Sequence, residues 1–146
     1  MPPWGAVKGF GDFRNDAALS QDQLDRIAQW VDGGAPEGDP APRPKPLPSI
    51  SRQRAAREVV IDGDYTVARP MILDGLLPKT VAADASVQLT AELPDGRIEP
   101  LLWLHHYQLQ YRHPFLLRTP LRLPQGTIIR GVPRGTCIAL LVIAAR

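Results

Sequence analysis

The sequence predicts a mainly β fold: an antiparallel sandwich or barrel-like domain with a small N-terminal α-helical segment. Two observations lead to this prediction. Apolar and polar residues alternate along residues 86–93, the turn Pro94-Asp95-Gly96 follows, and an apolar run resumes at residues 98–104, which together indicate an antiparallel hairpin. Turn signals rich in Pro and Gly then recur every 8 to 12 residues or so, as is typical of antiparallel β domains.

Composition limits the class of protein. The chain has 146 residues, 44% of them hydrophobic, which suffices for one ordinary core. With 17 basic and 15 acidic residues, the net charge of +2 gives no reason to expect a nucleic-acid partner. No stretch approaches the roughly 20 apolar residues that cross a bilayer, and the first residues lack a signal-peptide pattern. The single cysteine, Cys137, excludes an internal disulfide.

The first 15 residues contain too much Gly and Pro for regular structure. They also contain three aromatic residues, Trp4, Phe10 and Phe13. We expect such a segment to become ordered only by packing onto another surface.

A short amphipathic helix is predicted over about residues 20–33. Ser20 and Gln23 have the spacing of a capping box. Apolar residues follow at helical spacing, and Gly33 and Gly34 can form a left-handed cap at the end. A helix of about three turns needs a packing partner to be stable.

A proline-rich linker is predicted over residues 41–55. Every second residue from 40 to 48 is proline, which favours a stiff polyproline-like conformation. At about 3.1 Å per residue this repeat spans roughly 28 Å, so the N-terminal segment (residues 1–40) and the β domain need not touch. We favour an interdomain linker over a docking motif for a proline-binding module, because the repeat lies between structured parts.

The antiparallel β domain is expected over residues 56–146. Its strands are predicted at residues 58–61, 65–69, 70–73, 79–83, 86–93, 98–104, 111–118, 121–123, 127–132 and 136–144. Asp74-Gly75 is interpreted as a turn. The run at residues 98–104 is apolar on both sides, which predicts a position inside the sandwich and not at an edge, and the last strand is predicted to be central for the same reason.

Few residues suggest chemistry. In an extended strand the adjacent His105 and His106 point to opposite faces, so only one of them could join His113 in a metal site. Copper or zinc needs at least three converging ligands, and we therefore expect surface or loop histidines and no metal site. The turn Asp62-Gly63-Asp64 lacks the longer ligand series of a calcium site. Because no phosphate loop or nucleophile motif is present, we expect no catalytic residues and no enzyme activity of this chain alone.

A family resemblance supplies a functional expectation. Residues 1–40 read MPPWGAVKGFGDFRNDAALSQDQLDRIAQWVDGGAPEGDP. They resemble the C-terminal part of bacterial periplasmic c-type cytochrome domains, in which an MPPW segment, a loop ending in F-x-N-D and a helix closing on W-V-D-x-G-A-P-x-G-[DN]-P follow the haem. The resemblance implies that Met1 is the axial thioether ligand of the haem iron and that Trp4 and Phe10 shield the porphyrin from water.

The chain departs from this family in one respect. Haem c attachment requires a C-x-x-C-H motif, and the chain has neither that motif nor the cysteines for it. We therefore expect haem c in an intact, periplasmic parent protein, with the haem and the export signal upstream of Met1, and no haem bound covalently by this chain. The alternative for Met1 is an initiator methionine.

The remaining resemblance concerns the β domain. Residues 74–132 are similar to β domains that follow such cytochrome segments, and to the last strands of the sandwich in copper type II ascorbate-dependent monooxygenases. There D-G-x-x-x-x-L-L-x-[IL]-x-x-[YW] leads to [FY]-x-x-x-x-P-[LI]-x-[LI]-P-x-G-[ST]. The copper ligands of those enzymes have no counterparts here, so the similarity implies the fold and not the activity.

The sequence thus predicts a truncated fragment of a periplasmic c-type cytochrome. Electron transfer is expected in the intact protein, with the β domain as a docking or structural module, and the expected partner is a redox protein or the missing haem-bearing region. One alternative is a non-catalytic β-sandwich interaction module whose N-terminal helix packs on a partner chain. Another is a remnant of a copper-dependent monooxygenase-like protein. The sequence does not predict an oligomeric state.

Overall fold

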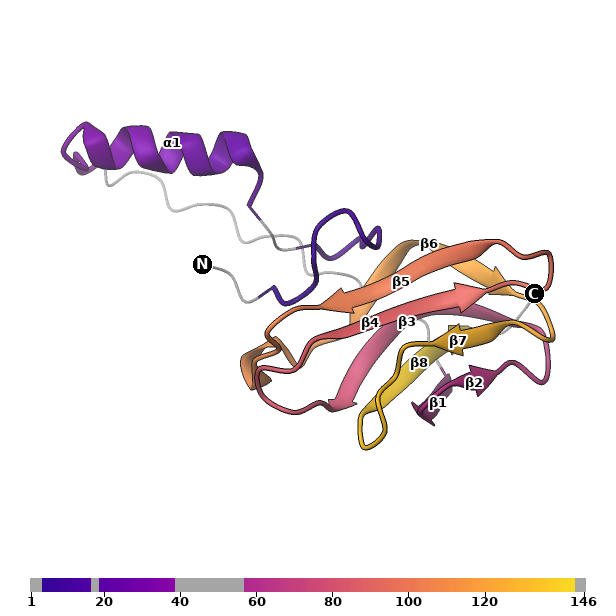
Figure 1. Cartoon of the computed structure of the whole chain (residues 1–146). Helices are drawn as coiled ribbons and strands as arrows, with labels where there is room; N and C mark the ends of the chain where they lie inside the picture. The colour runs from indigo at the N-terminus through magenta and orange to yellow at the C-terminus, as the bar shows by residue number, and fades with distance from the viewer. Residues whose placement is uncertain (1–3, 17–18, 39–56, 144–146) are drawn as a thin grey trace.

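The computed structural model describes residues 4–16, 19–38 and 57–143. Their strands form two four-stranded antiparallel sheets that stack as a sandwich and do not close into a barrel (Figure 1). One sheet has the order β1 (Arg57–Asp62), β8 (Cys137–Ile143), β3 (Met71–Thr80), β6 (Phe115–Leu123), and the other β2 (Tyr65–Thr66), β7 (Ile128–Arg130), β4 (Val87–Glu92), β5 (Ile98–Leu104). The predicted mainly β sandwich is confirmed, and β8 is central as predicted.

The predicted hairpin is β4 and β5. Leu89 pairs with Leu102 in an antiparallel register, and the turn between the strands is closed by a hydrogen bond from Leu93 N–H to Arg97 O (2.8 Å). Alternate residues of β4 are buried (Val87, Leu89 and Ala91), because the period of two sends them into the space between the sheets. The inner faces of both sheets supply one continuous core.

The prediction of a turn at Asp74-Gly75 is wrong. β3 continues through these residues and pairs with β8 on one side and β6 on the other. The register shifts between Leu73 and Gly75, so this pair marks a bulge. A side chain at Gly75 would lie 2.6 Å from Phe115 O. The glycine therefore permits a close approach of β6. Within a strand, glycine often marks such a close approach of two backbones and not a turn.

Strand β6 is also longer than predicted, because Pro120 does not interrupt it. The register jumps from Leu73 opposite Leu121 to Gly75 opposite Leu116, so residues 117–120 bulge away from β3. The N–H that Pro120 lacks is therefore not needed by the sheet. Tyr111, predicted to begin this strand, lies instead in a 3-10 helix, η1 (Leu109–Tyr111).

The predicted interior position of residues 98–104 is wrong, because β5 is the last strand of its sheet among the described residues. Its apolar character has another cause. Residues 4–16 run along this side of the sandwich and join the edge of β5 to the edge of β6. The backbone contacts are Ala6 with Leu104, Val7 N–H with Trp103 O (2.7 Å), Phe13 with Leu117 and Arg14 N–H with Leu116 O (2.8 Å).

The predicted helix is confirmed as α1 (Gln21–Asp32). Ser20 is its N-cap, and the Ser20 and Gln23 side chains form both bonds of the capping box. Gly34 has φ +85° and ends the helix in the left-handed conformation, with its N–H bonded to Val31 O and that of Ala35 to Trp30 O. Every residue of α1 is exposed, and the helix lies beside the sandwich and not on it (Figure 1).

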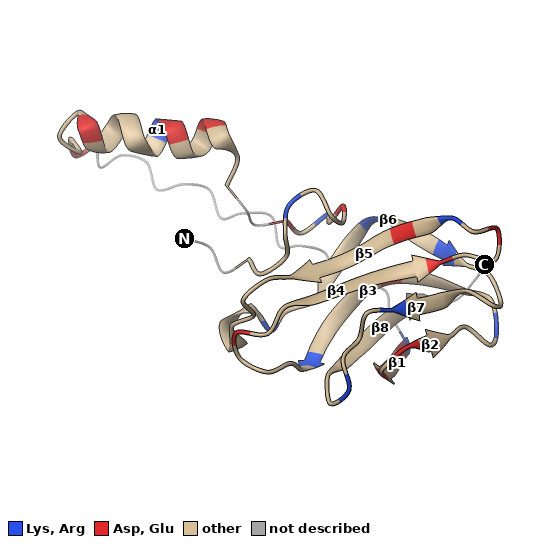
Figure 2. Ribbon diagram, viewed as in Figure 1, with Lys and Arg blue, Asp and Glu red and all other residues tan. Residues whose placement is uncertain are grey.

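Charges of both signs are interspersed over the sandwich in the view of Figure 2. Within the described ranges, no helix has the length and apolar content that crossing a bilayer requires. The predicted linker at residues 41–55 and the predicted haem ligand Met1 lie outside the described residues. The division into N-terminal segment, linker and β domain stays a prediction, although residues 4–16 pack as part of the sandwich.

Candidate functional site

The N-terminal segment begins with an aromatic cluster at the start of β6. The ring of Trp4 stacks on His113 (centroids 5.3 Å apart) and meets the edges of Phe13 (5.8 Å) and Phe115 (5.1 Å). Phe13 and Phe115 are buried, and Trp4 is half-buried. Aromatic pairs in these arrangements add to the free energy of burial. The cluster therefore anchors the start of the segment to the sandwich. This agrees with the expectation that the segment becomes ordered by packing onto another surface.

An ion pair anchors the other end of the segment. The Arg14 guanidinium donates to both carboxylate oxygens of Asp74, at 2.8 and 2.7 Å, and also to Leu117 O (3.0 Å). Asp74 is 6% exposed and is the only buried charged residue among those described. A buried carboxylate is costly unless it is paired. The hydrogen bonds to Asp74, with the attraction between the two charges, raise the pKa of Arg14 above its usual value.

The bulges of β3 and β6 make room for this pair. Asp74 lies at the register shift of β3, opposite the residues of β6 that bulge outward. Asn15 adds two further bonds beside it, from its Nδ2 to Pro114 O (2.7 Å) and from Leu116 N–H to its Oδ1 (3.0 Å). Three consecutive residues, Phe13, Arg14 and Asn15, are therefore used to hold the segment on the sandwich. They belong to the F-x-N-D stretch that carries part of the resemblance.

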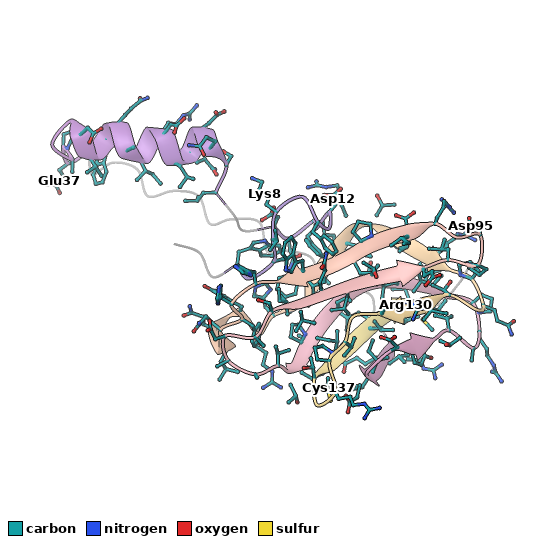
Figure 3. The ribbon with its side chains drawn as sticks, in the orientation of Figure 1. Lys8, Asp12, Glu37, Asp95, Arg130 and Cys137 are labelled. Carbon is teal, nitrogen blue, oxygen red and sulfur yellow. The ribbon has the colours of Figure 1, made fainter. Side chains whose placement is uncertain are left out.

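The two described residues predicted to contact haem are not brought together. Trp4 borders a shallow depression of about 340 Å³, whose other lining residues include His105, His106 and Tyr111. Phe10 packs edge-on against Trp103 (5.7 Å) and borders a different open depression, of about 580 Å³, between the segment and the β5 and β6 edges. Lys8 and Asp12, labelled in Figure 3, lie on the loop that borders this second depression.

The residues present fit a haem only in part. Trp4, half-buried and three positions after Met1, has the size and polarity to cover one side of a porphyrin. Phe10 faces other residues, and its predicted haem contact stays a prediction. The single cysteine, Cys137, begins β8 and is half-buried, so any thioether bonds to a haem must come from cysteines outside this chain.

The histidine prediction rested on an extended backbone, and that premise is wrong. β5 ends at Leu104, and His106 adopts a left-handed φ of +47°. The rings of His105 and His106 consequently lie together, with centroids 4.2 Å apart, while His113 stacks on Trp4. Left-handed φ is uncommon at any single non-glycine residue, even at types such as His that adopt it more often, so the sequence did not predict this pair.

Tyr107 fixes the loop that carries the histidines. It is 1% exposed, and burial raises the pKa of its phenol. Its backbone is bonded to the loop before β4, from Asp84 N–H to Tyr107 O (2.7 Å) and from Tyr107 N–H to Ala85 O (2.9 Å). The loops on either side of the hairpin are thereby held side by side at one end of the sandwich (Figure 1).

Comparisons with protein-family models, with curated proteins and with solved structures give no match. In the part of the chain that the structure describes, no three His, Cys, Asp or Glu side chains cluster closely enough to hold a metal ion together.

Proposed function

We propose that this chain is the tail and sandwich of a periplasmic c-type cytochrome, which transfers electrons once it is joined to a haem-bearing region. The sandwich serves as the docking or structural module of that protein. One observation carries the proposal: the bidentate bond of Arg14 to the buried Asp74. It ties the segment that, by resemblance, follows the axial ligand to the core of the sandwich.

This attachment restricts where a haem could sit. Met1 precedes Trp4 by three residues, so its Cα lies within about 11 Å of that of Trp4. In the proposal Met1 would hold the haem iron through its thioether and Trp4 would shield the haem from water, while Arg14 and the aromatic cluster keep Trp4 fixed on the sandwich. Haem c, when bound, supplies one-electron transfer and is attached through cysteines outside this chain.

The exposed apolar face of α1 supports the proposal that this chain binds a further protein region. Leu24, Ile27, Trp30 and Val31 are 36 to 55% exposed, although such a stripe is normally buried against another element. A helix this short gains its stability from that packing. We assign the stripe to the haem-bearing region, whether it precedes this chain in one polypeptide or belongs to a separate redox protein.

The test is the absorption spectrum of the product of the native locus, upstream region included, made in cells with a c-type haem maturation system. A reduced α-band is expected, and Met1→Ala should shift it or weaken it, because the axial thioether is lost. Met71→Ala, which removes the only other methionine of this chain, is the matched control and should leave the band in place. A haem-free product, or an α-band whose position and intensity do not change in Met1→Ala, contradicts the proposal.

The exposure of α1 also favours a second candidate, a non-catalytic interaction module that holds a partner chain through this helix. In that case the product would contain no haem, and a complex with a defined partner would be lost on Ile27→Asp. Ile98→Asp is the control, since Ile98 is 66% exposed on the sandwich and should not affect such a complex.

A further inference from the structure

His105 and His106 present two imidazoles to solvent at one end of the sandwich. Both residues are exposed, and their ring planes meet at 65° with centroids 4.2 Å apart. This arrangement depends on the left-handed φ of +47° at His106. Such a conformation is unfavourable at a residue with a side chain, and strained backbone of this kind is often found at binding sites.

The loop before β4 fixes one nitrogen of each ring. His106 Nδ1 lies 2.7 Å from Asp84 Oδ1, and His105 Nδ1 lies 3.2 Å from Ser86 Oγ. When each Nδ1 carries the proton, it donates to these oxygens, and each Nε2 keeps its lone pair. Oxygen partners on Nδ1 orient metal-ligating histidines and make the other nitrogen a better donor.

Further oxygen donors border the same depression. Gln108 and Tyr111 line it together with the two histidines and Trp4. The loop itself is anchored by the buried Tyr107 and its two backbone bonds, so the backbone that carries the imidazoles is held in place before any ligand binds. Such pre-organisation reduces the entropic cost of binding.

We propose that His105 and His106 bind one divalent transition-metal ion through their Nε2 atoms, with Cu²⁺ as the preferred ion. Imidazole suits Cu²⁺, Ni²⁺ and Zn²⁺, and Cu²⁺ binds most tightly of the three at a given set of nitrogen and oxygen donors. Solvent completes the coordination. The site replaces the expectation of no metal, because that expectation placed the two rings on opposite faces. It does not depend on the proposed cytochrome function.

The experiment is a titration of the full chain, free of any histidine tag, with Cu²⁺ alone. Calorimetry should show one saturable equivalent, and electron paramagnetic resonance should show hyperfine coupling to two nitrogens. His105→Gln and His106→Asn should each weaken binding by more than about tenfold, the loss that even an outer partner of a metal ligand typically causes. Asn is chosen at position 106 because it tolerates the left-handed conformation.

Two further variants separate a built site from general histidine binding. His113→Gln removes the third histidine of the chain and should leave Cu²⁺ affinity unchanged. Asp84→Asn keeps both ligands and should weaken binding by about tenfold, because it removes the carboxylate that orients His106. Thermal unfolding shows that each variant is folded, and His105→Gln carries the test if His106→Asn is not. No saturable equivalent, or an equal loss in His113→Gln, would overturn the proposal.

Discussion

Residues 4–16 and helix α1 are neighbours in the sequence, yet they relate to the sandwich in opposite ways. The segment has almost no regular structure, but its Ala6 and Phe13 are only 7% and 4% exposed. The helix is regular and capped at both ends, but every residue of it is exposed. Regularity and burial are therefore independent properties in this chain.

Backbone hydrogen bonding explains the difference. A helix satisfies its own interior N–H and C=O groups and can remain in water. An irregular segment must find partners elsewhere, and residues 4–16 find them on the edges of β5 and β6. The segment is consequently part of the core, while the apolar stripe of α1 stays exposed.

The largest expected effect is that of Arg14→Ala. It leaves the Asp74 carboxylate buried without its partner, which should lower the free energy of unfolding by about 3 kcal/mol, the lower end of the range for breaking a buried ion pair, because Arg14 is partly exposed. Arg118→Ala removes an exposed ion pair with Asp12 between the same two parts and should leave the urea midpoint nearly unchanged. Equal small effects of the two variants would show that the segment is not held by Asp74.

A comparison of two tryptophans, one in each region, should give a smaller effect. Trp4→Ala removes the centre of the aromatic cluster and should cost about 2 kcal/mol, less than for a fully buried ring. Trp30→Ala on α1 should change the unfolding free energy by no more than about 0.5 kcal/mol, since Trp30 is 52% exposed. Urea titration of both variants decides, and the comparison fails if Trp30→Ala is the more damaging.

Glycines offer the next comparison. A side chain at Gly11 would lie 2.8 Å from Leu101 O and 2.7 Å from the Phe13 ring, so Gly11→Ala should push the segment off β5 at a cost of about 1.5 kcal/mol. Gly38, beyond α1, has open space around it, and Gly38→Ala should leave the thermal midpoint where it is. A tolerated Gly11→Ala would mean that the segment is loosely held.

The smallest expected effect on the sandwich is that of Ser20→Ala. Loss of the cap should destabilise α1 alone by about 1 kcal/mol, which hydrogen exchange of the helix amides would detect. Ser20→Asp, which keeps a capping oxygen, is the control. Unfolding of the sandwich should be the same in all three proteins, and a shared change would show that α1 and the sandwich unfold together.

The elements that were predicted correctly are those whose signals are local. The capping box of α1 and the alternation of β4 involve residues a few positions apart, and both were found as predicted. Asp74-Gly75 was misread because the partner of Asp74 is Arg14, sixty positions away, and nothing near Asp74 indicates that a buried carboxylate is paired. The apolar run of β5 was likewise misplaced, because the cover over its edge comes from another part of the chain.

The candidate sites were less predictable. Packing of Trp4 onto another surface was expected from composition alone, but its neighbours, His113 and Phe115, were not. The joining of His105 and His106 depends on one backbone angle that no pattern signals. The roles of Met1, Trp4 and Phe10 toward haem come from the resemblance, and they stay predictions until the absorption spectrum is measured.

The position of residues 4–16 also bears on how the protein avoids self-association. Unpaired strand edges are templates for strands of other molecules, and β5 and β6 present two such edges side by side. Removal of residues 4–16 would uncover both edges and leave the carboxylate of Asp74 without Arg14. A sandwich without this segment should then aggregate through these edges. Residues 4–16 therefore protect the protein from self-association by covering them.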